Sequence, residues 1–407
     1  MVLFAIGIVL AIPTALFLGY LLMLSLLARF SPRIAEVKAE RMYRIAVIVP
    51  AHNEEGAIAE TIRSIQNVEY PLQSFEAVVI ADNCTDATAS VARAMGARVF
   101  ERESKVLRGK GYALRWCFDR ILRDHPEFEA VVVVDADSNL SPDFLSVVNH
   151  YLNSGALAIQ SSDLVKPREG AWSSESTRMG FTLYNVVRPL GRRVLKCSAG
   201  LRGNGMCFAV EALRRVPWDA YSKAEDLEYG LKLLLNGIGV MFAPEAKVYA
   251  TMPADARNAE TQRARWEGGR FPIVKQFAGS LLVGAFRRRS FALLDALIDL
   301  VTPPLVNLMG FALLMGMFSA LFWLAGVPGM GYVTLVWFLS VAAGGLHVIV
   351  GLNAAGADRK LFAALLHIPR YVLWKVVLYA KLLRGGTSNE WVRTTREVPQ
   401  PDPKSQP

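Results

Sequence analysis

The hydrophobic positions of this chain fall into long runs at its two ends and short runs in between. An apolar stretch without any charge covers Val2 to Leu27, and further long apolar runs begin after residue 303. Between them, short runs rich in β-branched residues alternate with segments of helical character. A helix that crosses a bilayer needs about 20 apolar residues. The pattern therefore predicts membrane segments at both ends and an α/β domain between them.

The first half of that domain predicts four buried strands with helices between them. The strands are expected at Ile45–Val49, Glu76–Ala81, Ala97–Phe100 and Val131–Val134. Helices are expected at Ala57–Gln66 and Ala87–Met95. Such alternation favours right-handed crossovers and parallel strands, and four consecutive valines are typical of a central strand buried on both faces.

Polar residues follow three of these strands. They are His52, Asn53 and Glu54, then Asp82 and Asn83, then Asp135 and Asp137. In open α/β sheets, ligands bind beyond the carboxyl ends of the strands. Two carboxylates one residue apart suit Mg²⁺ or Mn²⁺ that also holds a substrate phosphate, although single residues of this set could simply cap helices. The chain has neither G-x-G-x-x-G after the first strand nor G-x-x-x-x-G-K-[ST], which disfavours dinucleotide and P-loop sites.

Six motifs in order resemble those of family 2 glycosyltransferases. The donor half is similar at Val47–Glu55, Ala81–Asp86, Gly109–Leu114 and Asp135-Ala-Asp137. Ala224-Glu225-Asp226 is similar to the T-E-D element, with Ala where Thr is usual, and Gln262-Arg-Ala-Arg-Trp266 to the Q-x-x-R-W of membrane-bound members such as cellulose, hyaluronan and poly-N-acetylglucosamine synthases. The likeness runs from about Arg44 to Trp266, with a weaker echo at Trp391–Arg396.

For the donor half, the resemblance implies a GT-A fold, a Rossmann-like mixed sheet that binds a nucleotide sugar, usually a UDP-sugar. Asp82 would contact the uracil or ribose, and the segment with Pro50, His52, Asn53 and Glu54 would line the base. Asp135 would hold the ribose and, with Asp137, a divalent ion that bridges the diphosphate. Lys110 would reach the nucleotide or phosphate, unless it is a solvated surface lysine. Gln262, Arg265 and Trp266 would also bind the donor, since arginine can bind diphosphate bidentately; an interfacial anchor is the alternative for this segment.

On the acceptor side, the resemblance makes Asp226 the base that takes the acceptor's proton. Neighbouring Glu225 and partial desolvation would raise the pKa of this carboxylate, which favours base chemistry; a merely charged helix face is the alternative. One transfer without an enzyme nucleophile would invert the anomeric centre through an oxocarbenium-like transition state. Glu225, Gly203, Asn204 and Gly205 are expected on the acceptor side, as is the basic segment Phe181–Met206.

The charged residues beside the apolar runs predict the topology. Residues 1–28 are expected to form a retained anchor. Five basic residues and two acidic ones lie between positions 29 and 44, which places the 44–255 catalytic domain in the cytoplasm at the inner (plasma) membrane. Residues 256–303 are expected to form interfacial helices, with Asp295 and Asp299 as a polar edge.

Membrane helices are expected within 304–385, with clear spans at Leu305–Ala325 and Gly331–Leu352. Leu361–Leu383 is ambiguous, because several of its side chains are costly in lipid. Three spans are preferred and four are the alternative. A tail at 386–407 is expected to be disordered after 397.

Composition adds two restrictions. The net charge of +9 is explained by a membrane surface and a phosphorylated ligand better than by nucleic acid, because the basic residues adjoin apolar segments. The four cysteines lack metal-ligand spacing and indicate reduced thiols.

The function expected is an inverting, metal-dependent glycosyltransferase with a lipid, lipid-linked or polysaccharide acceptor. The small number of expected spans favours a lipid acceptor, because a processive polysaccharide synthase has more spans around a translocation channel. A nucleotidyltransferase and a non-catalytic nucleotide-sugar sensor are distant alternatives.

Overall fold

The computed structural model describes residues 2–32, 34, 41–166, 172–251 and 256–367, and side chains are described except at 2, 172–174, 256–268 and 366–367. The chain divides into two compact units. The sheet unit comprises 34–166 and 200–277, and the helical unit comprises 1–33, 167–199 and 278–388.

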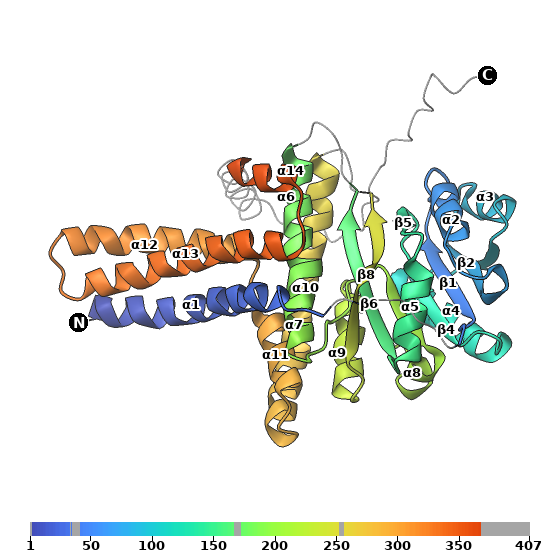
Figure 1. The fold of residues 1–407 in the computed structure, drawn as a ribbon, viewed down its shortest axis with the longest axis horizontal. Coiled ribbons are helices and arrows are strands. Elements are labelled where there is room, and N and C mark those ends of the chain that lie inside the picture. Colours follow the sequence, from blue (N-terminus) through green and yellow to red (C-terminus); the bar gives the residue numbers. More distant parts are fainter. Residues whose placement is uncertain (1, 33, 35–40, 167–171, 252–255, 368–407) are drawn as a thin grey trace. The chain divides into compact units, whose positions relative to one another are not determined.

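The sheet unit is built on one eight-stranded mixed sheet with the order β3-β2-β1-β4-β7-β6-β8-β5. The strands are β1 (Ile45–Ala51), β2 (Phe75–Asp82), β3 (Arg98–Arg102), β4 (Ala130–Val133), β5 (Ser138–Leu140), β6 (Ala158–Val165), β7 (Met206–Ala209) and β8 (Val240–Ala250). The four strands predicted from the first half are confirmed and parallel, whereas β7 is antiparallel to both β4 and β6. The predicted mixed sheet is therefore confirmed (Figure 1).

The register of the parallel strands brings their carboxyl ends to one edge. Ile48 of β1 is level with Val133 of β4, and Ala51 of β1 is level with Ala81 of β2. The whole of Val131 to Val134 is fully buried, as expected for a strand covered on both faces. The residues that follow β1, β2 and β4 therefore emerge along the same rim of the sheet.

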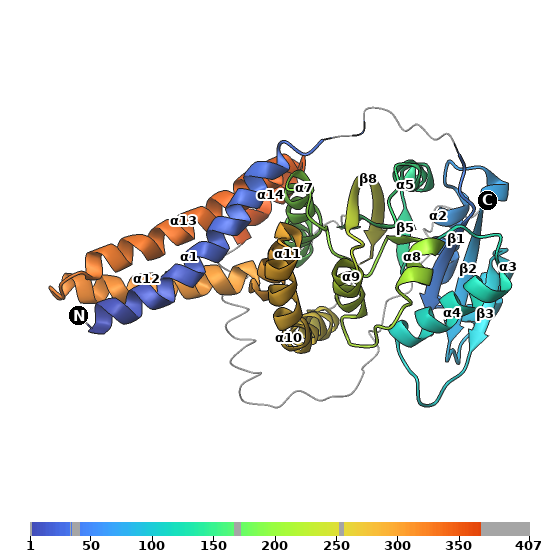
Figure 2. The same cartoon turned by 90° about the horizontal axis from the view of Figure 1, so that it is seen from below.

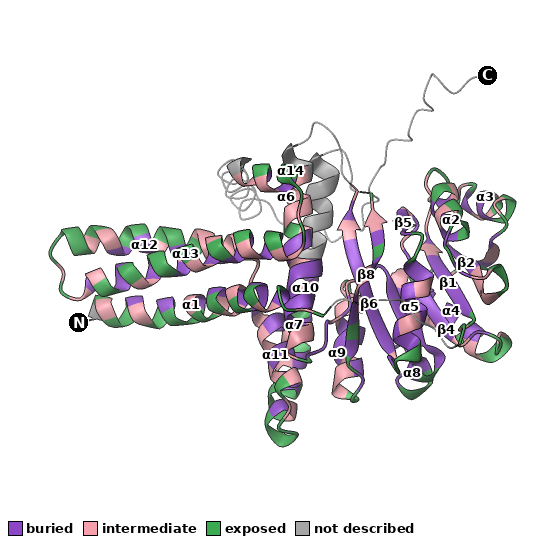
Figure 3. Cartoon of the chain, viewed as in Figure 1, coloured by how far each residue is buried: buried purple, intermediate pink, exposed green. Residues whose placement is uncertain are grey.

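Helices of the sheet unit connect and cover these strands, and the strands form its buried centre (Figure 3). They are α2 (Ile58–Gln66), η1 (Leu72–Ser74), α3 (Thr88–Ala94), α4 (Lys110–Asp124), α5 (Phe144–Asn153), α8 (Val210–Arg215), α9 (Glu225–Leu235) and the first part of α10 (Ala256–Arg287).

The helical unit contains three helices long and apolar enough to cross a membrane among the described residues. They are α1 (Val2–Ala28), α12 (Leu305–Leu324) and α13 (Met330–Ala354), which lie side by side in both views (Figures 1 and 2). The expected helices at Val2–Leu27, Leu305–Ala325 and Gly331–Leu352 are thus confirmed. The remaining helices are α6 (Trp172–Phe181), η2 (Thr182–Val187), α7 (Arg188–Val194), α11 (Phe291–Val301), α14 (Arg359–Ala363) and η3 (Ala364–His367).

Several expectations fall wholly or mostly outside the described residues. Most of the ambiguous segment Leu361–Leu383 lies there, as do the weak motif at Trp391–Arg396 and the predicted tail. The choice between three and four spans stays a prediction.

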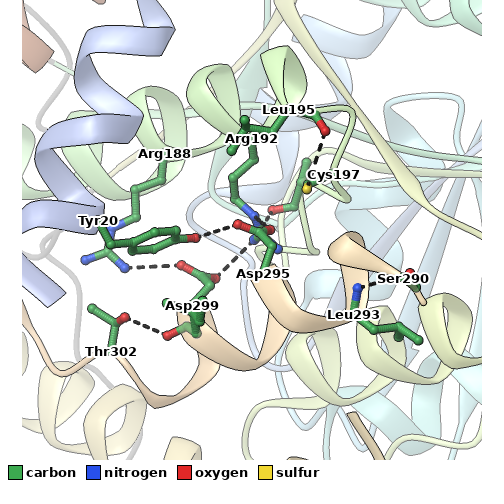
Figure 4. A network of polar contacts seen from close by, with 12 residues as sticks. Tyr20, Arg188, Arg192, Leu195, Cys197, Ser290, Leu293, Asp295, Asp299 and Thr302 are labelled. Carbon is green, nitrogen blue, oxygen red and sulfur yellow. Dashed lines mark hydrogen bonds and ion pairs between the residues drawn. The ribbon is translucent and has the colours of Figure 1, made fainter. Parts of the chain in front are cut away.

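The polar edge expected on α11 does not face outwards. Asp295 is fully buried and Asp299 is 4% exposed. Arg192 of α7 binds both carboxylates, at 2.6 Å to Asp295 and 3.1 Å to Asp299, and Arg188 lies 3.3 Å from Asp299 (Figure 4). The acceptor-side role expected for the basic segment is therefore wrong for these two arginines, because buried carboxylates of the same unit occupy them.

Candidate active site

The loops after β1 and β2 hold each other. The Nδ1 atom of His52 lies 2.7 Å from the carbonyl oxygen of Asp82. The Asn53 side chain accepts from the backbone N–H of Thr85 at 2.7 Å, and the N–H of Glu54 donates to Thr88 Oγ1 at 2.7 Å. Three residues predicted to line the base thus lie at the rim, where part of their hydrogen-bonding capacity shapes the loops.

Asp82 ends β2 and is 7% exposed. Its Oδ1 accepts from the guanidinium of Arg102 and from Asn83 Nδ2. Arg102, at the end of β3 and level with Asp82, also donates to the carbonyl of Leu107 at 2.6 Å. The sequence motifs do not include Arg102. The feature that could have indicated Arg102 is a basic residue at the end of the strand that lies next to β2.

Lys110 connects two motifs at the centre of the site. Its Nζ donates to Asp135 Oδ1 at 2.5 Å and to the carbonyl oxygen of Gly203 at 2.6 Å. Burial alone would lower the pKa of this ammonium, but Asp135, Glu225 and Asp226 raise it above its ordinary value. The solvated-surface alternative for Lys110 is therefore wrong, because the lysine is held between two elements of the rim.

Lys110 is brought there by close packing of the start of α4. A Cβ at Gly111 would lie 2.3 Å from the carbonyl oxygen of Ala220, so the backbones approach as only glycine allows. Trp218 Nε1 donates to the carbonyl of Gly111, and Arg115 donates to the carbonyl of Trp218. These contacts fix the α4 amino end against the chain that leads into α9.

Asn204 organises the loop after β4. Its Oδ1 accepts from the backbone N–H of Asp135 at 3.1 Å, and its Nδ2 donates to Ser138 Oγ and Asp163 Oδ1. Because Asn204 is only 3% exposed, its side chain supports the carboxylate loop. The side chain of Asn204 is thus already engaged within the protein. An acceptor contact at this position stays a prediction, and only for the backbone of Asn204.

Asp163, on β6, is a site residue that the motifs did not reveal. It is 5% exposed. Burial and the nearby Asp135 raise the pKa of this carboxyl well above its ordinary value, against the hydrogen bond from Asn204. Nothing in its sequence neighbourhood distinguishes it, since its meeting with Asp135 depends on the pairing of distant strands.

Asp226 lies in the first turn of α9, against the glycine that binds Lys110. Gly203 has φ of +83°, and a Cβ there would lie 3.2 Å from Asp226 Oδ2. Burial raises the pKa of Asp226, while hydrogen bonds at the helix amino end, Lys110 and Arg202 lower it. Burial likewise raises the pKa of Glu225. The predicted raised pKa of Asp226 is thereby supported, with burial rather than the neighbouring Glu225 as its cause.

The next acid on α9, Glu228, has a different role. It is 6% exposed, accepts from the backbone N–H of Ser222 at 3.1 Å, and binds Lys232 at 2.9 Å. Glu228 therefore secures the segment before α9, and its substitution would disturb structure as well as chemistry.

The motif Gln262 to Trp266 lies on α10, but its side chains are not described. The helix itself can be placed: a Cβ at Gly269 would lie 3.5 Å from the Cβ of Ala224, the residue before α9. The helix that carries Gln262, Arg265 and Trp266 thus packs beside the start of the helix that carries Asp226. Donor contacts by these three residues stay predictions.

The donor set at the end of β4 fits a divalent ion held jointly with a substrate. Asp135 and Asp137 offer carboxylate oxygens, and Mg²⁺ typically uses one or two carboxylates plus substrate phosphates. Among the described residues, no three His, Cys, Asp or Glu side chains gather as a complete metal site. An ion here would therefore take its remaining ligands from the diphosphate and water.

Comparisons with known proteins agree on the family. The model of the family described as "Glycosyltransferase like family 2" matches residues 43–269. A probable glycosyltransferase, YdaM of Bacillus subtilis, is 24% identical over 58% of this chain and 57% of its own. The β-monoglucosyldiacylglycerol synthase of Nostoc is 27% identical over 55% of this chain and 48% of its own. The chain spans about half the length of these curated relatives.

One solved structure supports the fold over most of the chain. The mannosyltransferase PcManGT of Pyrobaculum calidifontis, in complex with GDP-Man and Mn²⁺, superposes with a TM-score of 0.53 at 20% identity. The match covers 85% of this chain and 99% of that structure. With more than half of its residues matched by the family model, the chain belongs to the family 2 glycosyltransferases and has the GT-A fold.

Proposed function

We propose that this family 2 glycosyltransferase is an inverting, metal-dependent enzyme that moves a sugar from a nucleotide sugar, UDP-linked by first choice, to a hydroxyl of a membrane lipid at the cytoplasmic face. One observation carries the proposal. Lys110 binds Asp135 and the Gly203 carbonyl, and Gly203 lies against Asp226. The residue that would meet the diphosphate and the residue that would take a proton are thus held around one point.

The donor would lie along the rim, with its base near Asp82 and its diphosphate near Asp135, Asp137 and Lys110. A divalent ion on the two carboxylates would neutralise charge on the leaving diphosphate. PcManGT was solved with GDP-Man and Mn²⁺, which agrees with such an ion. Because Lys110 is bonded to Asp135, we expect its ammonium to shift to the phosphate oxygens when the donor and ion bind.

Transfer would proceed in one displacement. The acceptor hydroxyl oxygen forms a bond to the anomeric carbon while the bond from that carbon to the phosphate oxygen breaks, and the electron pair leaves with the diphosphate. Asp226 accepts the hydroxyl proton. Its raised pKa makes it a stronger base than an ordinary carboxylate. A single displacement inverts the configuration, so an α-linked donor yields a β-linked product.

A lipid acceptor is supported by the helical unit and by a relative. Within the described part of the chain, three helices are long and apolar enough to span a bilayer, and the Nostoc relative is named for making β-monoglucosyldiacylglycerol. A second candidate is chain extension of a polysaccharide. The poly-β-1,6-N-acetyl-D-glucosamine synthase of Staphylococcus epidermidis, 22% identical over 60% of each chain, favours it.

The test uses the full chain in nanodiscs made with diacylglycerol or total membrane lipid, a panel of UDP- and GDP-sugars, and Mn²⁺ or Mg²⁺. We expect one sugar to be transferred to lipid only when the ion is present, with inverted linkage by NMR. A soluble or polymeric product instead would favour the polysaccharide candidate. Donor binding without transfer to any lipid or glycan would contradict the proposal.

A further inference from the structure

Helix α11 shows an inverted distribution of polar and apolar residues. At 100° per residue, its buried positions cover one side of the helix. They are Leu293, Asp295, Ala296, Asp299 and Leu300. The opposite side is partly or largely exposed and entirely apolar, with Phe291, Leu294, Leu297, Ile298 and Val301. A helix on a water-facing surface has the reverse arrangement. The outward side of α11 is therefore suited to lipid.

The buried charges explain why α11 is turned this way. Arg192 binds both Asp295 and Asp299, and the hydroxyl of Tyr20 donates to Asp295 at 2.8 Å (Figure 4). Arg192, Asp295 and Asp299 are buried, and Tyr20 is partly buried. Removing two carboxylates from water requires such partners. The network fixes the polar side of α11 inwards, so the outward side of the helix carries only apolar side chains.

The place of α11 in the helical unit fits the edge of a bilayer. The helix runs across the direction of α1, α12 and α13 (Figure 1). Tyr20 lies eight residues before Ala28, the end of α1, which is about 12 Å along the helix axis. If α1 spans the membrane, its contact with Asp295 sets α11 at the boundary between headgroups and acyl chains rather than outside the bilayer.

A basic cluster adjoins this helix. Arg287, Arg288 and Arg289, at the end of α10 and in the turn to α11, are all exposed. Large apolar side chains lie on both sides of them, with Phe286 75% and Phe291 54% exposed. Consecutive arginines between exposed aromatic residues match the chemistry of a headgroup layer, in which phosphates lie above acyl chains.

We propose that residues 282–301 form a membrane-surface hairpin that binds anionic phospholipid, with α11's outward side among the acyl chains and Arg287–Arg289 on the headgroup phosphates. The charge complementarity of three arginines selects an anionic lipid. The three long helices fix a bilayer beside the hairpin. The alternative occupants of this surface, which the tests below distinguish, are a second copy of the chain and a soluble phosphate compound. This contact with the membrane does not depend on which sugar is transferred.

The first test measures depth. Leu294→Cys is introduced after Cys84→Ser, since the other three cysteines are buried, and is spin-labelled in nanodiscs. Collisions with O₂ and with a water-soluble nickel complex are then compared. Leu335→Cys, on the exposed side of α13, serves as the lipid reference, and Glu211→Cys, at an exposed position of α8, as the water reference. We expect position 294 to favour O₂, as position 335 does. Behaviour like that of position 211 would overturn the proposal.

The second test measures headgroup preference. Association of spin-labelled phosphatidylglycerol and phosphatidylcholine is compared for the native chain and for Arg287→Gln/Arg288→Gln/Arg289→Gln. Arg214→Gln/Arg215→Gln, which removes exposed arginines of α8, is the matched control. We expect the native chain to prefer phosphatidylglycerol roughly fivefold. The triple variant should bind both lipids about equally, and the control should keep the native preference.

Three outcomes would contradict the anionic-lipid assignment. They are equal binding of both lipids by the native chain, loss of the preference with millimolar inorganic phosphate, and a dimer in nanodiscs that Phe286→Ser dissociates. Monodisperse elution and unchanged thermal unfolding of the triple variant show that its fold is intact, so a lost preference then counts for the proposal.

Discussion

Each unit holds a cluster of charged side chains, and the two clusters differ in burial and in balance. In the helical unit, two arginines face two carboxylates, and every one of the four is at most 4% exposed. In the sheet unit, five carboxylates gather around two basic groups among the described residues. The acids are Asp135, Asp137, Asp163, Glu225 and Asp226, and the basic groups are Lys110 and Arg202.

The difference in balance separates structure from chemistry. A matched set of buried charges satisfies itself, so it can fix a helix without any ligand. An excess of acid raises carboxylate pKa values and favours uptake of a proton or a cation. The network of the helical unit therefore indicates a structural role, whereas the excess of acid in the sheet unit supports the proposed site, which a metal ion and an acceptor proton would complete.

The largest expected effect tests the acid-rich cluster. Asp226→Asn keeps the shape of the side chain but cannot take the acceptor's proton, so turnover should fall about 10² to 10⁴-fold. Nucleotide affinity should change little, because the donor contacts come from other elements. Initial rates and donor titrations decide this, with Glu211→Gln, an exposed acid on α8, as the control. Lost donor affinity with normal turnover would place Asp226 in the donor site.

The balanced network should respond in stability instead. Asp295→Asn removes one of the two carboxylates that bind Arg192, so the buried network keeps an excess of positive charge. Breaking a buried pair costs about 3–5 kcal/mol in the free energy of unfolding. Thermal unfolding in nanodiscs measures the loss, and exposed Asp124→Asn is the control. The combined change Arg192→Met/Asp295→Leu should cost less than the sum of the single changes, because it removes both charges together. Additive losses would mean that the two residues do not act as a pair.

Removing a proposed metal ligand should have a smaller effect, which is expected in the binding of the donor nucleotide. Asp135→Ala or Asp137→Ala should weaken Mn²⁺-dependent binding of the donor nucleotide at least tenfold, since each change removes one of the two protein carboxylates expected on the ion. Calorimetric titration with and without Mn²⁺ measures this. Unchanged Mn²⁺-dependent affinity in both variants would remove the metal assignment. Asp119→Asn, on the exposed side of α4, is a suitable control.

The smallest effect concerns pH. Because burial raises the pKa values of Glu225 and Asp226, turnover should decline on acidification at a higher pH than for an ordinary carboxylate, whose pKa is about 4. The folded state also binds these protons more tightly than the unfolded state. The resulting stabilisation is present at low pH and is lost as the pH rises through the raised pKa values. Rate and unfolding profiles of native and Asp226→Asn chains measure both slopes; identical unfolding slopes would contradict the shift.

Much of the fold follows from local pattern. Runs of β-branched residues such as Ile45–Val49 and Val131–Val134 strongly favour buried strands. The uncharged segment from Val2 to Leu27 strongly favours an apolar helix. The rim was predictable for the same reason, because parallel strands align their carboxyl ends. Asp82, Lys110, Asp135 and Asp226 therefore stand in or next to motifs that the sequence displays.

What the sequence did not display depends on pairs that meet only in the fold. Arg102 reaches Asp82 because β3 lies beside β2 in the sheet. Asp163 comes near Asp135 because β6 is separated from β4 by β7 alone. The spacing of Asp295 and Asp299 predicts a polar helix edge equally well for water and for buried arginines. Only the packing of α7 against that edge reveals that Arg188 and Arg192 face it.

The most direct test of the contrast between the clusters measures turnover per folded molecule and the unfolding midpoint side by side for Asp226→Asn and Asp295→Asn. The contrast predicts that Asp226→Asn loses at least 10²-fold in turnover with an equal or higher midpoint at neutral pH. It predicts that Asp295→Asn loses stability while its folded fraction keeps near-native turnover. A stable Asp295→Asn without activity, or an unstable Asp226→Asn with full activity, would contradict it.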